Sequence, residues 1–160
     1  MTVRLAGPDD EDELYELIMA LDRDNNSFGI VPDETRIREY IQQGTQRAGG
    51  YHGVIDAPGG TATLEPKGQR IIGSIGVVFD RYWCAKNYNL QILWFFVRLE
   101  WRGNQYEEEL MNWARAYRDK LREVAPIELI DSPFSRVRLP AKIRWWRKHG
   151  EQIGGIFIIR

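Results

Sequence analysis

The residues best placed to do chemistry follow the most apolar stretch of the chain. Leu90 to Val97 is almost entirely apolar, and Arg102-Gly103 and the start of an amphipathic helix come shortly after it. A strand, a tight turn and a helix N-terminus in this order bring free backbone N–H groups together with the positive end of a helix dipole. Such an arrangement favours bound anions, phosphates above all. The sequence therefore predicts an anion-binding turn over residues 102–107.

Two side chains in this turn work against a bound phosphate. Gln105 has a side chain where a glycine would let a diphosphate approach the backbone. Glu107 brings a like charge, which at about 4 Å repels a phosphate by roughly 1 kcal/mol in water and by several times that in a partly buried site. We therefore expect Glu107 to point away from the turn and to pair with Arg98 or Arg102 if an anion binds here.

Composition narrows the class of protein. The chain has 160 residues, the size of a single domain spanning 1–160, and its formal net charge of −1 argues against nucleic acid as a partner. Acidic residues gather in 9–24 and basic residues in 136–148. These two segments are interpreted either as solvated helix faces or, for the basic one, as a wall that meets an anionic ligand.

The reactive residue types exclude other classes of site. Cys84 is the only cysteine, so we expect no internal disulfide and a reducing, cytoplasmic location. His52 and His149 are far apart in the sequence, and no spacing suits a metal site. The chain shows no signal-peptide core and no apolar run of membrane-spanning length.

Hydrophobic periodicity and turn residues place the elements that would hold this turn. The order predicts an α/β fold in which a mixed sheet of about six to seven strands carries helices on both faces. A crossover helix over 104–122 joins two parallel strands. The strands are expected at 2–5, 51–56, 70–79, 90–97, 127–130 and 154–159, and the other helices from Asp9 or Asp10 to Leu21, from Asp33 to Gly44 and from Pro140 to Gly150. Asp22 to Pro32 is expected to be a loop.

Three segments in this order resemble the GNAT N-acetyltransferase superfamily across essentially the whole chain. VRLAGPDDEDELYEL is similar to its opening strand and first helix, VRLEWRG to the end of its fourth strand, and AKIRWWRKHG to its last helix. The set also looks similar to small acetyltransferase-like proteins encoded by bacteriophages. The resemblance implies a GNAT-like sheet, acetyl-CoA as co-substrate, and transfer of an acetyl group to an amine on a small molecule or protein.

The resemblance also implies roles for individual residues. Phe96 and Val97 would pair with pantetheine through their backbone, and Arg144 or Arg147 would meet the 3′-phosphate. The pyrophosphate would lie on the turn formed by Arg102, Gly103, Asn104, Gln105, Tyr106 and Glu107. Family members often form homodimers, and the apolar segment Ile153 to Ile159 suits strand pairing with a second copy.

The positions of the general base and general acid depart from the family pattern. Gln91 stands where a carboxylate is usual, and an amide cannot take a proton at neutral pH. Trp146 stands where a tyrosine is usual, and an indole N–H is no practical acid. Glu100, His52 or a chain of water molecules would have to supply a base instead. His149 is expected to be a cation favoured by the helix C-terminus or a polar surface residue.

Two functions from different classes therefore remain open, and a third is favoured less than either. The first is an N-acetyltransferase with a degenerate CoA-phosphate loop. The second is a catalytically inactive module of the same fold that binds or assembles with a protein partner. Nucleic-acid binding through the basic, aromatic segment from Arg136 to Lys148 is the third.

Overall fold

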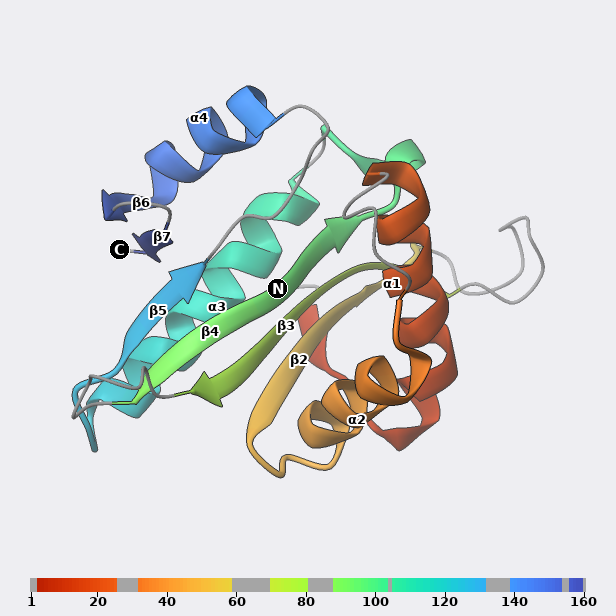
Figure 1. The fold of residues 1–160 in the computed structure, drawn as a ribbon, viewed down its shortest axis with the longest axis horizontal. Helices are drawn as coiled ribbons and strands as arrows, with labels where there is room; N and C mark the ends of the chain where they lie inside the picture. Colours follow the sequence, from red (N-terminus) through yellow and green to blue (C-terminus); the bar gives the residue numbers. More distant parts are fainter. Residues whose placement is uncertain are drawn as a thin grey trace.

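One seven-stranded mixed sheet organises the protein (Figure 1). The computed structural model describes residues 3–25, 32–58, 70–80, 88–103, 105–131, 139–153 and 156–159. The strands are β1 (Val3–Leu5), β2 (Gly50–Asp56), β3 (Ile71–Asp80), β4 (Asn89–Val97), β5 (Glu128–Asp131), β6 (Gly150–Ile153) and β7 (Ile156–Ile159). The helices are α1 (Glu11–Asn25), α2 (Glu34–Thr45), α3 (Tyr106–Arg122) and α4 (Leu139–His149), with short 3₁₀ turns η1 (Pro8–Asp10) and η3 (Leu99–Trp101).

The strand order is β1-β2-β3-β4-β5-β7-β6. Only β4 and β5 pair in parallel, and α3 forms the crossover between them. Acidic side chains fill the first turn of α3 and basic ones its last turn, as the helix dipole favours. The α/β fold and the strand count that the sequence predicts are confirmed.

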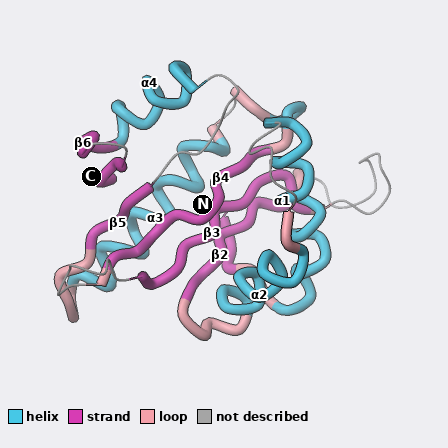
Figure 2. Tube along the Cα trace, viewed as in Figure 1, coloured by secondary structure: helices cyan, strands magenta, loops and turns pink. Residues whose placement is uncertain are grey.

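Helices cover both faces of the sheet (Figures 1 and 2). Leu14 and Leu17 of α1 and Ile41 of α2 pack with Trp94 and Phe96 on one face. The second core cluster, on the other face, joins residues of α3 and α4 to the remaining strand side chains, among them Leu110, Trp113 and Trp146.

Some element boundaries differ from those expected. α1 continues to Asn25 instead of ending before Asp22, because no glycine or proline interrupts the sequence up to that point. The first helix also does not start directly from an aspartate cap. Residues 8–10 form the 3₁₀ turn η1, and the Asp10 carboxylate accepts a hydrogen bond from the Gly7 amide, 2.8 Å away.

The strand β6 was not expected from the sequence. Gly150 ends α4 as predicted, but it is also the first residue of β6, which pairs antiparallel with β7. β7 therefore lies between β5 and β6 and is not at the sheet edge. Of the apolar segment Ile153 to Ile159, only Ile153 lies in the edge strand β6, and pairing with a second copy stays a prediction.

Candidate functional site

The described pairing between β4 and β5 covers only the first part of β4, and the stretch beyond it, which no described strand pairs on that side, is termed the β4 opening. Asn89 to Ile92 pair with Glu128 to Asp131, and no β5 partner lies beside Leu93 to Val97 within the described ranges. A register shift between Gly76 and Val77 of β3 accompanies this change on the other side of β4. The last part of β4 thus offers backbone groups on its β5 side that no described strand pairs.

The described residues of the turn after β4 include a glycine with positive φ. η3 is followed by Arg102 and by Gly103, whose φ of 80° is in the left-handed region that favours glycine. Gln105 precedes α3 and makes no side-chain capping hydrogen bond. The first turn of α3 is therefore not capped by its N-cap residue, as an anion site at a helix N-terminus requires.

Glu107 points back into this turn. The Gly103 N–H donates to its carboxylate oxygen Oε1 at 3.4 Å, in an exposed position. This distance is longer than the usual range for an N–H···O bond, so the contact is weak. The carboxylate nevertheless contacts an amide that the sequence assigns to a phosphate. Among the described residues, Arg98 makes no contact with Glu107, so the expected pair with Arg98 does not form.

Arg102 folds back over the end of β4. Its Nε donates to the Val97 carbonyl oxygen at 2.6 Å, and its guanidinium lies 4.7 Å from the centre of the Phe96 ring. The Val97 carbonyl that was expected to pair with pantetheine is therefore engaged by a side chain of the protein.

Three other residues predicted for the site lie on β4, on η3 and at the start of α3. Gln91 is half-buried on β4 between Val78 of β3 and Ile130 of β5, while Glu100 is exposed on η3. The Tyr106 ring meets Trp101 edge to face at 5.9 Å. Asn104 lies outside the described residues, as do Cys84 and residues 136–138 of the basic segment.

Trp146 contributes to an aromatic wall and not to acid–base chemistry. It is buried, and its ring meets Phe95 of β4 at 5.8 Å, while Trp145 stacks on the same phenylalanine at 5.1 Å. These rings connect α4 to β4 beside the opening.

Neither histidine is placed to act as a base at the opening. His52 is fully buried, and its Nε2 lies 2.9 Å from the Tyr40 carbonyl oxygen of α2. His149 is buried rather than a surface cation, which corrects the prediction. Its Nδ1 accepts from Arg115 at 2.9 Å, and burial is the main reason that its pKa is lowered, despite Glu108 3.4 Å away.

Arg98, which the sequence suggests only as a partner for Glu107, is deeply buried at the end of β4. It follows β4 directly and is 9% exposed, and its Nε donates to the Ile71 carbonyl oxygen at 3.0 Å. Its Nη2 is buried and has no hydrogen-bond partner. Burial lowers the pKa of Arg98, against the opposing effect of Glu100 and Glu13. A cation directly after an apolar strand was the only signal in the sequence.

The described residues contain no group of three or more histidine, cysteine, aspartate or glutamate side chains that could hold an ion. Nor does any helix in the described ranges have the length and apolar character needed to span a bilayer.

Comparison with known proteins gives the fold. No protein-family model matches the chain, and no curated protein matches it by sequence. A predicted acetyltransferase from Clostridium acetobutylicum, solved with acetyl-CoA, is 16% identical with a TM-score of 0.67 over 95% of this chain and 90% of that one. Arabidopsis thaliana NAA60, in complex with a bisubstrate analogue, is 13% identical with a TM-score of 0.67 over 98% and 95%.

A third structure agrees with these two. The ribosomal-protein-alanine N-acetyltransferase from Brucella melitensis is 12% identical to this chain, with a TM-score of 0.64 over 99% of this chain and 96% of that one. At such identities the similarity concerns the arrangement of the backbone and not the chemistry of the site. The protein has the GNAT fold of these acetyltransferases.

Proposed function

We propose that the protein is an acetyl-CoA-dependent N-acetyltransferase that acts on an amine. The observation that carries the proposal is the end of the β4–β5 pairing at Ile92. Beyond this residue, the β4 edge can pair with an extended ligand in the manner of an added strand, which needs no particular side chain. Two structures of the same fold are complexes with acetyl-CoA, which supports this ligand.

The turn after β4 fits the phosphates of acetyl-CoA in part. Gly103 has the required backbone geometry, and the N-terminus of α3 supplies a positive dipole end. The Glu107 carboxylate must leave the Gly103 amide for a diphosphate to bind there. Because that contact is long and exposed, we expect it to be displaced at modest cost.

The chemistry assigned to the chain is mainly positional. Acetyl-CoA would supply the acetyl group as a thioester. Gln91 has no titratable proton, and Trp146 is packed on Phe95, so neither serves as acid or base. We assign one role to the backbone amides at the β4 opening: they orient the thioester and the oxyanion that develops on it. Such positioning can contribute much of a rate enhancement.

A second function is favoured by a specific observation. Two positions assigned to the donor are already engaged by side chains of the protein, because Glu107 takes the Gly103 amide and Arg102 takes the Val97 carbonyl. If these contacts persist in solution, the protein is an inactive module of the GNAT fold that binds a protein partner.

Binding of acetyl-CoA separates the two functions. We expect isothermal titration to give a saturable heat, and thermal unfolding to shift upward as ligand concentration rises above Kd. Pantetheine, which lacks the nucleotide diphosphate, serves as the matched ligand and should bind more weakly. The absence of both heat and shift at about 1 mM acetyl-CoA, far above a typical Kd, would reject the enzyme and leave the module as the remaining proposal.

A further inference from the structure

The guanidinium of Arg98 is a buried cation just after the C-terminal end of β4. Its backbone N–H donates to the Ile72 carbonyl oxygen at 2.9 Å, and its Nε donates to the Ile71 carbonyl oxygen. Two hydrogen bonds to β3 therefore fix the backbone of Arg98 and the Nε atom of its guanidinium. Charged side chains are almost never this deeply buried without a charged partner.

No ion pair compensates this cation among the described residues. Nη2 is buried without a hydrogen-bond partner, although Glu13 and Glu16 of α1 and Glu100 of η3 are near enough to affect its electrostatics. Glu13 instead accepts from the Ile71 amide and lies close to Arg70. A buried donor left unpaired in this way calls for an explanation, and a group supplied by a ligand is one.

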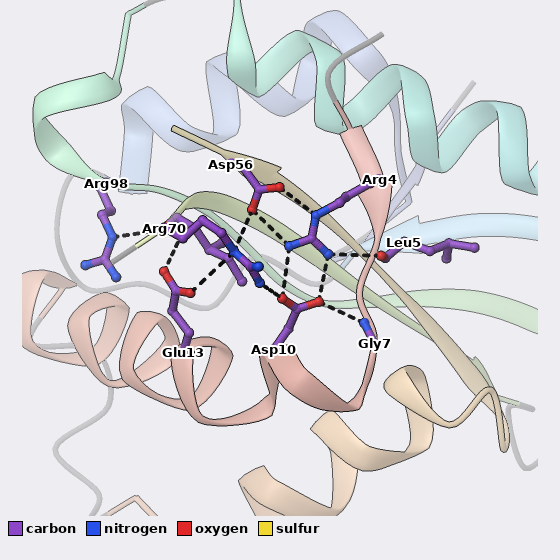
Figure 3. A network of polar contacts seen from close by, with 9 residues as sticks. Arg4, Leu5, Gly7, Asp10, Glu13, Asp56, Arg70 and Arg98 are labelled. Carbon is purple, nitrogen blue, oxygen red and sulfur yellow. Dashed lines mark hydrogen bonds and ion pairs between the residues drawn. The ribbon is translucent and has the colours of Figure 1, made fainter. Parts of the chain in front are cut away.

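The place of Arg98 indicates which ligand would meet it. The side chain lies on the side of the sheet that α1 covers, near Arg70 and the carboxylates that pair with it (Figure 3). The proposed donor site instead involves the turn leading into α3, which packs on the opposite face. A ligand that approaches β4 from the α1 side would be the acceptor and not the donor.

We propose that the acceptor carries an oxyanion, foremost a carboxylate, which Arg98 binds through Nη2. This inference rests on the proposed function and names the class of its substrate as amines with an anionic group, such as amino acids. The guanidinium is suited to carboxylates because its planar donors match their geometry. Since Nη2 is buried, the side chains that cover it must move aside when the acceptor binds.

The test compares amines that differ only in the anionic group. The pairs are L-phenylalanine with 2-phenylethylamine, L-leucine with isoamylamine, L-lysine with cadaverine, and phosphoethanolamine with ethanolamine. Initial rates with acetyl-CoA give KM and kcat for each amine. Thermal unfolding of the protein without acetyl-CoA gives a readout of binding that needs no turnover.

We expect the anionic member of at least one pair to have a KM lower by about tenfold or more, the scale of a charge-assisted hydrogen bond. The same member alone should raise the unfolding temperature. Arg98→Met should remove both preferences with little change in kcat, and Arg98→Lys, which keeps the charge but not the fork, should keep part of them. Arg122→Met, an exposed arginine at the end of α3, is the matched control and should leave them unchanged.

Each result decides between the proposals. A preference confined to the phosphoethanolamine pair supports an oxyanion site and identifies its source as a phosphate. Equal responses within every pair, or a preference that survives Arg98→Met, overturn the inference while the acetyltransferase proposal stands if acetyl-CoA binds. Failure of acetyl-CoA to bind overturns both. Should Arg98→Met not fold, the Arg98→Lys variant provides the comparison.

Discussion

Arg70 and Arg98 lie at the same end of the β3–β4 pair, yet their guanidinium groups have opposite surroundings (Figure 3). Arg70, directly before β3, contacts the carboxylates of Asp10, Asp56 and Glu13. Arg98, directly after β4, contacts a single backbone carbonyl through its side chain. Ile71 lies between them, since its N–H donates to Glu13 and its carbonyl accepts from Arg98.

The paired cluster has an evident structural task. Arg4 of β1 bridges Asp10 and Asp56 through hydrogen bonds of 2.6 to 2.9 Å, and so connects β1, η1 and β2. The Asp10 side chain is only 4% exposed and receives both arginines and the Gly7 amide. In this cluster of Arg4, Asp10, Glu13, Asp56 and Arg70, each guanidinium already meets carboxylates, whereas the Arg98 guanidinium meets none among the described residues.

The largest effect is expected from Asp10→Ala. The substitution removes the carboxylate that both arginines share and leaves the Gly7 amide without its acceptor. We expect the free energy of unfolding to fall by about 3 kcal/mol, the low end for breaking a buried pair, because the arginines remain partly exposed. Urea unfolding measures this change. An unaltered preference for anionic amines should accompany it, and a loss of that preference at constant stability would contradict the division between this cluster and Arg98.

Acid should remove the same contribution. Burial opposes ionisation of Asp10, but hydrogen bonds from Arg4 and the Gly7 amide outweigh it, so its pKa is lowered from 3.8. The stabilisation is therefore complete above the pKa of the unfolded chain and is lost as pH falls through the lower pKa of the folded protein. Below pH 3.8 we expect the stability difference between wild type and Asp10→Ala to shrink progressively. A difference that stays constant down to pH 2 would show that Asp10 does not act through its charge.

The contrast between these arginines also shows what a sequence can and cannot reveal. Alternation and turn residues predict β3, β4 and α3 because those signals are local. Arg70 and Arg98 look alike in the sequence, since each is one arginine beside an apolar strand. Their difference depends on Asp10 and Asp56, which are distant in the chain and meet Arg70 only in the folded protein.

The side-chain conformation of Glu107 and the burial of His149 could not be predicted from the sequence for a related reason. The unfavourable charge of Glu107 was evident from its position, but its contact with the Gly103 amide depends on the rotamer that the side chain adopts. His149 looked like a surface residue because it ends a basic helix. Its burial follows from packing against Trp145 and Arg115, at ring distances and hydrogen bonds that no local pattern encodes.

Glu107→Gln should have an intermediate effect, on the ligand and not on the fold. Removing the charge abolishes the repulsion of a bound diphosphate, which is worth roughly 1 kcal/mol at an exposed site, while the side chain keeps its size. We expect acetyl-CoA to bind about fivefold more tightly by isothermal titration, and pantetheine to bind unchanged. Equal affinities of the variant and the wild type for acetyl-CoA would mean that the phosphates do not lie on this turn.

The smallest effect is expected from Glu128→Gln, the matched control on β5. Glu128 pairs with Arg122, and both side chains are largely exposed, at 47% and 39%. Exposed pairs of this kind are screened by water and typically contribute about 0.5 kcal/mol. Urea unfolding should therefore detect a change several times smaller than for Asp10→Ala, and acetyl-CoA affinity should match that of the wild type. If Glu128→Gln strengthened acetyl-CoA binding as much as Glu107→Gln, the gain would reflect the overall charge of the protein. The Glu107→Gln result would then no longer support binding of the phosphates at the turn after β4.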